Sequence, residues 1–169
     1  MTDCAAILES ARVLVEANRL EEADTLLTDA VAGAPDELSL LAMHADIAIR
    51  RGAWDDAVHR WAVVRGRALN HPASYVLGAR AFDELQRTQE ADELLLRGCS
   101  YCPGDIWVLS VWADHAARRE DWPEAVLRWQ ELRRQFPDHC TVLVQLARAC
   151  NALGDFGQAE SLINTAAEL

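Results

Sequence analysis

Two sets of alanines recur every 34 residues along this chain, and their spacing constrains the fold more than any other feature. The first set is Ala23, Ala57, Ala91, Ala125 and Ala159. The second set is Ala11, Ala45, Ala79, Ala113 and Ala147. A fixed period of this length, kept without insertion, is typical of arrays of stacked supersecondary units. It predicts one domain over residues 1–169, built from repeats 4–37, 38–71, 72–105, 106–139 and 140–169.

Each repeat is predicted to hold two helices. Large apolar residues occupy the same position of the second helix in every repeat, namely Leu27, Trp61, Leu95, Trp129 and Ile163. Prolines end three repeats, at Pro35, Pro103 and Pro137, because a ring without an N–H stops a helix. The alanines mark places where helices approach closely, and stacking of the repeats builds the core. The fold class is therefore predicted to be all-α.

Segments such as GAWDDAVHRW and EDWPEAVLRWQELRRQFPD resemble tetratricopeptide repeats, in length and in the order of small, apolar and proline positions. The resemblance covers residues 4–169. It implies an α-solenoid of five helix-turn-helix repeats with a right-handed superhelix. It also implies a protein that binds other proteins in a concave groove lined by the first helix of each repeat.

A longer period of two repeats is also present. Repeats two and four share an Arg–Trp pair, at Arg60–Trp61 and Arg128–Trp129. Repeats one, three and five instead share similar segments, with the sequences EEADTLL, QEADELL and GQAESLI. This alternation resembles repeats found beside glycosyltransferase or sulfotransferase domains in GC-rich bacteria. All 16 basic residues are Arg, which is typical of a GC-rich genome and favours a bacterial source.

The net charge limits the kinds of partner that the protein is expected to bind. A net charge of −11 repels phosphate backbones and anionic lipid, so we expect neither nucleic acid nor a membrane as partner. The first residues, MTDCAAILES, lack the basic and apolar regions of a secretory signal, which favours a cytoplasmic location. Five cysteines form no disulfide-scaffold pattern and are expected to be reduced thiols.

The family resemblance also implies which side chains face the groove. They are predicted from positions two, five, nine, twelve and thirteen of each repeat. The predicted protein-binding residues are Arg12, Asp46, Arg50, Arg80, Asp83, Glu84, Trp107, Asp114, Arg118, Arg148 and Asn151.

Two features of this set have alternative interpretations. The ninth position alternates in sign along the chain, through Arg12, Asp46, Arg80, Asp114 and Arg148. Either the charges form ion pairs between repeats, or the arginines bind an acidic or carboxylate-bearing peptide. In the second case a partner would use Arg80 with Arg118, whose neighbours in the groove do not fully neutralise them. Trp107 either contacts a partner in the groove or packs at a repeat junction.

The sequence predicts no catalytic, metal-binding or cofactor-binding residues. Cys99-x-x-Cys102 lacks a second ligand pair at a suitable spacing, and it ends a helix rather than following a strand. The five histidines have no recurrent carboxylate or nucleophile partner, and no phosphate-binding glycine loop is present. An enzyme in its own right is the least favoured of the function classes.

The predicted function is that of a protein-binding adaptor or scaffold, and the resemblance to repeats beside glycosyltransferase domains implies a link to bacterial glycosylation through a partner enzyme. The alternative is a secretion chaperone that holds a secreted client. At the last repeat, the apolar face of Leu162, Ile163 and Ala166 is expected to be covered by a downstream domain, a second copy or a partner.

Overall fold

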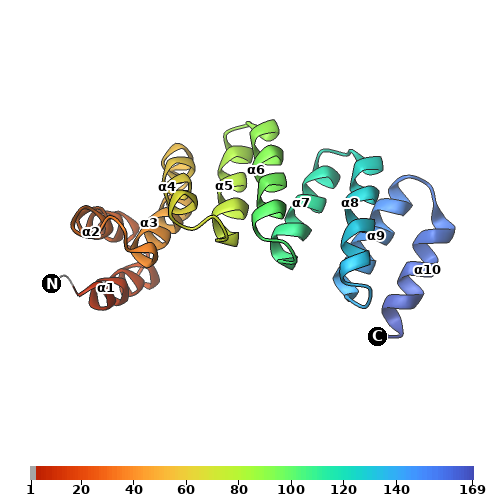
Figure 1. Ribbon diagram of the computed structural model, residues 1–169, viewed down its shortest axis with the longest axis horizontal. Helices are drawn as coiled ribbons and strands as arrows, with labels where there is room; N and C mark the ends of the chain where they lie inside the picture. Colours follow the sequence, from red (N-terminus) through yellow and green to blue (C-terminus); the bar gives the residue numbers. More distant parts are fainter. Residues whose placement is uncertain (1–2) are drawn as a thin grey trace. The chain divides into compact units, whose positions relative to one another are not determined.

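The computed structural model describes residues 3–169, which fold into ten α-helices and no strand (Figure 1). Two compact units divide the chain, one up to Arg97 and one over Gly98–Leu169, and each is described by itself. The helices are α1 Cys4–Glu16, α2 Leu20–Gly33, α3 Leu38–Arg51, α4 Trp54–Arg67, α5 Pro72–Glu84, α6 Thr88–Tyr101, α7 Ile106–Arg118, α8 Trp122–Gln135, α9 Cys140–Ala152 and α10 Phe156–Ala167.

The odd-numbered helices begin at the first residue of each predicted repeat, and each is followed by a second helix after a short turn. The all-α prediction is therefore confirmed. Handedness and the prediction of one domain over residues 1–169 stay predictions. None of the described helices combines the length and the apolar character that crossing a bilayer requires.

Acidic side chains start several of the helices. Asp105 accepts a hydrogen bond from the Val108 N–H at 3.0 Å, and Asp155 accepts one from the Gln158 N–H at 3.1 Å. Asp121 accepts from the Glu124 N–H in the same way at 3.3 Å. These bonds satisfy N–H groups that have no partner within the helix.

The turn inside every repeat uses one residue in the left-handed region. These residues are Asn18, Gly52, Gln86, Glu120 and Gly154, with φ of 57°, 69°, 61°, 60° and 82°. The N–H of the next residue then returns to a carbonyl five residues back, as from Asp121 to Ala116 at 3.0 Å. This pattern is a Schellman cap, which ends the first helix and reverses the chain. The sequence did not reveal this position, because only two of its five residues are glycine.

In the first unit, α1 to α4 form two neighbouring apolar clusters. Leu40 and Ile47 of α3 are fully buried in the same cluster as Ala11 and Leu27 of the first repeat. Ala57 and Trp61 of α4 share the second cluster with Ala81 of α5. In this unit α3 and α5 thus each close the core of the repeat before them, as the predicted role of stacking requires.

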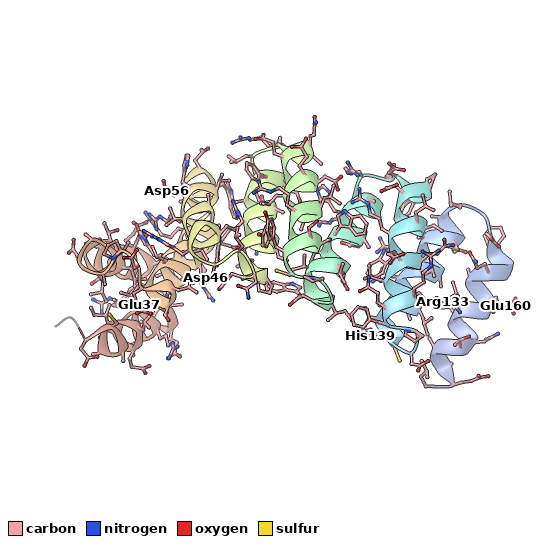
Figure 2. The ribbon with its side chains drawn as sticks, in the orientation of Figure 1. Glu37, Asp46, Asp56, Arg133, His139 and Glu160 are labelled. Atoms are coloured by element: carbon pink, nitrogen blue, oxygen red, sulfur yellow. The ribbon has the colours of Figure 1, made fainter. Side chains whose placement is uncertain are left out.

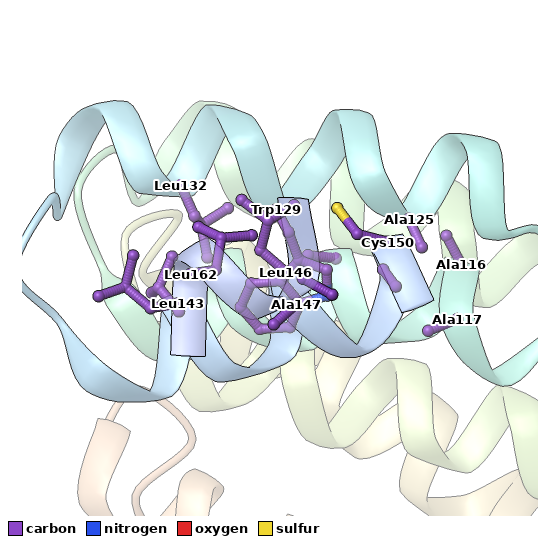
Figure 3. Close-up of a cluster of buried hydrophobic side chains, with 14 of the residues drawn as sticks. Ala116, Ala117, Ala125, Trp129, Leu132, Leu143, Leu146, Ala147, Cys150 and Leu162 are labelled. Carbon is purple, nitrogen blue, oxygen red and sulfur yellow. The ribbon is translucent and has the colours of Figure 1, made fainter. Parts of the chain in front are cut away.

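The second unit has one core cluster (Figure 3). Val142 and Ala149 of α9 pack with Trp129 and Leu132 of α8, all at most 2% exposed. The repeating alanines are all buried, from 0% exposure at Ala11 to 8% at Ala159. Their small size lets the helices approach closely, as the spacing predicts.

Charged groups also join the first two repeats. Asp24 of α2 accepts from Arg51 Nη1 of α3 and from Arg60 Nη1 of α4, each at 2.5 Å. Burial raises the pKa of Asp24, but the hydrogen bond and charge of Arg60 outweigh it and hold that pKa below its usual range. The side chain of Asp24 is 15% exposed, so this carboxylate is a partly buried link between repeats.

Candidate functional site

A groove lies between α7 and α9 in the second unit, with a volume of about 400 Å³. We name it the α7–α9 groove. Trp129 of α8, which is 2% exposed, forms its base. Its lining residues are Ser110, Val111, Asp114, Trp129, Thr141, Gln145 and Arg148.

Helical spacing brings these side chains to two facing walls. Ser110, Val111 and Asp114 lie on adjacent turns of α7, because residues three and four apart share one helix face. Thr141, Gln145 and Arg148 do the same on α9. The groove therefore combines hydroxyl and amide groups, one carboxylate and one guanidinium above an indole, which suits an extended peptide with both polar and apolar side chains.

The two charged walls differ in how far they are neutralised. Asp114 accepts from Arg118 Nε at 3.2 Å, one turn along α7. Arg148 donates only a long hydrogen bond, 3.5 Å, to Gln145 Oε1 and forms no ion pair with any described residue. In a chain of net charge −11, this uncompensated guanidinium favours a carboxylate on the partner.

The alternating charges at position nine do not pair from one repeat to the next within either unit. Asp46 pairs with Arg50 at 2.6 Å, and Arg12 with Glu9 at 3.5 Å, each on its own helix. The interpretation as ion pairs between repeats is therefore wrong there. Side chains three or four residues apart on one helix meet more readily than side chains on neighbouring helices.

The two arginines predicted to be incompletely neutralised, Arg80 and Arg118, have different surroundings. Arg118 pairs with Asp114 at 3.2 Å, and both side chains remain partly exposed, at 51% and 37%. Arg80 of α5 lies over the ring of Trp54, with its guanidinium carbon 5.8 Å from the ring centroid. A cation over an indole is stabilised without a carboxylate.

The structure brings Asp114 and Arg148 together in the α7–α9 groove. Asp83 and Glu84 lie at the end of α5, in the first unit. Trp107 is the second residue of α7 and is 45% exposed, and its contact with a partner stays a prediction.

Asn151 lines a second concavity, between α9 and α10, of about 570 Å³. We name it the α9–α10 pocket, and Val144, Ala147, Arg148, Phe156, Glu160 and Ile163 also line it. Of the apolar face predicted for the last repeat, only Ile163 is well exposed, at 46%. Leu162 is buried and Ala166 packs against the core, so that part of the prediction is wrong.

None of the five cysteines, all of which lie within residues 3–169, forms a disulfide, and their exposure varies from buried to exposed. Burial, with a contribution from Asp105, raises the pKa of Cys102, which keeps this thiol protonated at neutral pH. Within residues 3–169, no three histidine, cysteine, aspartate or glutamate side chains are grouped closely enough to hold a metal ion.

Five residues of the α7–α9 groove were not predicted from the sequence, namely Ser110, Val111, Trp129, Thr141 and Gln145. Ser110 and Thr141 occupy positions five and two, which the family resemblance marks as groove positions. Val111 and Gln145 occupy position six, which it does not mark. Trp129 was assigned to the core, and it serves both the core and the base of the groove.

Comparisons with known proteins agree on the fold. No protein-family model matches the chain, and no curated protein matches it. A crystal structure of MamA has a TM-score of 0.77 at 12% identity, covering 97% of this chain and 90% of that one. MamA 41-end from Desulfovibrio magneticus RS-1 gives 0.76 at 15% identity, covering 100% of this chain and 96% of that one.

A third similar structure is that of YrrB, described as a TPR protein with an unusual peptide-binding site. It has a TM-score of 0.68 at 13% identity, covering 98% of this chain and 86% of that one. At identities this low, the likeness establishes the fold alone. The chain therefore has the fold of a tetratricopeptide-repeat protein, an all-α solenoid of helix-turn-helix repeats, as the sequence predicts.

Proposed function

We propose that this protein is a binding adaptor that holds a peptide segment of another protein in the α7–α9 groove. The observation that carries the proposal is Arg148, a guanidinium without an ion pair on the wall of an amphipathic groove. The YrrB structure adds that a protein of this fold has a peptide-binding site. The proposal includes no catalytic step.

The groove defines the chemistry of the bound segment. A glutamate or aspartate of the partner meets Arg148, because carboxylate and guanidinium form strong paired hydrogen bonds. An apolar side chain lies on Trp129 at the base, where an indole offers a large contact area. The hydroxyls of Ser110 and Thr141 bond the peptide backbone.

A selection from a random peptide library tests this proposal. We expect the enriched sequences to share an acidic residue near an apolar one. Arg148→Glu is expected to weaken the selected peptides at least tenfold, since a like charge replaces an attractive one. Arg134→Glu is the matched control, because Arg134 is 75% exposed on α8 and does not line the groove. Selected peptides that bind wild type and Arg148→Glu equally would contradict the proposal.

Two narrower proposals concern the partner. One is an enzyme of bacterial glycosylation, for which the adaptor would be a targeting module. The other is a secreted client, for which the protein would be a cytoplasmic chaperone. Isolation of the native partner separates them, because a scaffold binds a folded enzyme through a short segment, whereas a chaperone holds an unfolded client.

A further inference from the structure

The α9–α10 pocket of the last repeat is lined largely by apolar side chains. Phe156 is 67% exposed, Ile163 46% and Val144 44%, and all three line it. Large apolar side chains grouped around one concavity indicate a binding surface rather than a solvated face.

The earlier repeats show what fills this surface elsewhere in the chain. Ile163 occupies the repeat position of Leu27 and Trp129, which are 0% and 2% exposed. Leu27 shares its cluster with Leu40 and Ile47 of α3, the next helix along the chain. Trp129 shares its cluster with Val142 and Ala149 of α9. The position that Ile163 occupies is therefore built to receive a helix.

The helix that covers the first repeat defines the pattern of such a guest. Leu40, Met43 and Ile47 of α3 pack onto that repeat, at spacing i, i+3 and i+7. Arg51, at i+11, pairs with Asp24 of α2 at 2.5 Å. Apolar residues at this spacing form one stripe of a helix, and the arginine continues the same face.

The last repeat has both an apolar residue and a carboxylate at the positions that contact α3 in the first repeat. Glu160 of α10 occupies the repeat position of Asp24, four repeats later, and lines the α9–α10 pocket beside Ile163. Figure 2 shows Glu160 on the outer side of α10. A guest helix with a basic residue at i+11 would thus meet a carboxylate, as Arg51 meets Asp24.

We propose that the α9–α10 pocket binds an amphipathic helix of a partner protein, with apolar residues at i, i+3 and i+7 and Arg or Lys at i+11. The first helix of a second copy fits this pattern poorly. It places Glu9 where α3 has Met43 and Ala17 where α3 has Arg51. Two copies of net charge −11 also repel each other.

The probe is a fluorescein-labelled peptide with the sequence of residues 37–52, which contains the α3 pattern. Fluorescence anisotropy on the full chain measures its binding. We expect saturable binding that Ile163→Glu weakens at least tenfold. Leu127→Glu, at a residue 61% exposed on α8 and outside the pocket, is expected to leave binding unchanged.

A charge exchange between the probe and Glu160 tests the inference independently, in case Ile163→Glu disturbs the fold of α10. The probe with glutamate in place of Arg51 is expected to bind wild type at least threefold more weakly. Glu160→Arg is expected to restore the binding of that altered probe. Asp114→Lys, at a residue that lines the α7–α9 groove but not the α9–α10 pocket, is expected to leave the helix probe unaffected, so failure of one site is distinguishable from failure of the other.

Three results would overturn the inference. The first is the absence of saturable binding to wild type, and the second is equal binding to Ile163→Glu in a folded protein. The third is a dimer in sedimentation equilibrium that Ile163→Glu dissociates, because a second copy would then occupy the pocket.

Discussion

Arg128 of α8 donates a hydrogen bond from Nη1 to the carbonyl oxygen of Trp112 on α7, at 2.9 Å, and its guanidinium carbon lies 4.6 Å from the centre of the Trp112 ring. Two repeats earlier, Arg60 makes the same bond to the carbonyl of His44, at 3.1 Å. The Arg–Trp pair that these two repeats share thus has a structural basis. In both, an arginine joins the second helix to the first.

Loss of this arginine is expected to destabilise the fold. Arg128 is 6% exposed and also donates to Glu124 at 2.8 Å, so Arg128→Gln removes several contacts at once. We expect the free energy of unfolding to fall by about 2–3 kcal/mol. Urea unfolding measures it, with Arg134→Gln, on the exposed surface of α8, as the control. Equal midpoints for the two variants would show that the contacts of Arg128, the bond to Trp112 included, contribute no more than those of an exposed arginine.

Substitution by alanine is expected to have opposite effects on stability at two glycines, one in a turn and one inside a helix. Gly52 has φ of 69°, and Gly66 lies inside α4 with open space where a side chain would begin. Gly52→Ala is expected to lower the free energy of unfolding by about 1 kcal/mol, whereas Gly66→Ala is expected to raise it by a similar amount.

At the equivalent turn of the fourth repeat, Glu120→Gly is expected to raise the free energy of unfolding by about 0.5–1 kcal/mol, because φ of 60° strains a residue with a side chain. Thermal unfolding of the three variants checks these signs. A destabilised Glu120→Gly would mean that the glutamate side chain makes a contact that outweighs the strain.

Protonation of two histidines is expected to weaken the fold below neutral pH. Burial and the charge of Arg60 lower the pKa of His44, and burial lowers the pKa of His71. Unfolded histidine has a pKa of about 6.5, so the unfolded chain binds more protons as pH falls through that value. The stabilisation is complete above a pH of about 6.5 and is lost on acidification towards the folded pKa.

Urea unfolding between pH 7.5 and pH 5.5 measures this dependence. The double variant His44→Gln/His71→Gln is expected to have a shallower dependence than wild type. Parallel curves for the two proteins would exclude the histidines as its source.

Thiol reactivity is expected to follow burial. Cys140 is exposed, whereas Cys102 and Cys150 are 7% and 1% exposed, and burial raises the pKa of both. A thiol reagent at pH 7.5 is expected to modify Cys140 first and to reach Cys102 and Cys150 only on unfolding. Peptide mapping of the modified protein reports the order. Early modification of Cys102 would instead revive a redox role for the Cys99-x-x-Cys102 segment.

The repeat period sufficed to predict where the first helices begin. Residues that recur every 34 positions pack alike, so Ala11 and Ala147 are buried in the same way. The left-handed turn could not be predicted, because Gln86 and Glu120 stand where a glycine would have marked it. Backbone hydrogen bonds of the cap fix that conformation whatever the side chain.

The candidate site was predicted only in part, because the sequence gives the face of a helix but not the partner of each charge. Asp114 and Arg148 were predicted as binding residues, and both line the α7–α9 groove. The sequence did not indicate that Arg118 pairs with Asp114, which lies one turn away on the same helix. Whether a charged side chain pairs with a neighbour on its own helix or with one on the next helix depends on side-chain rotamers, which the repeat period does not determine.

Arg148 is proposed to bind an acidic side chain of the partner, and a charge exchange between the two residues provides the decisive test. The peptide selected on wild type is titrated calorimetrically against wild type and Arg148→Glu, in its original form and with its acidic residue changed to arginine. We expect each single change to weaken binding and the combined change to restore it, with a coupling of about 1–3 kcal/mol. Additive losses without restoration would contradict the assignment of Arg148 as the residue that binds the partner's carboxylate.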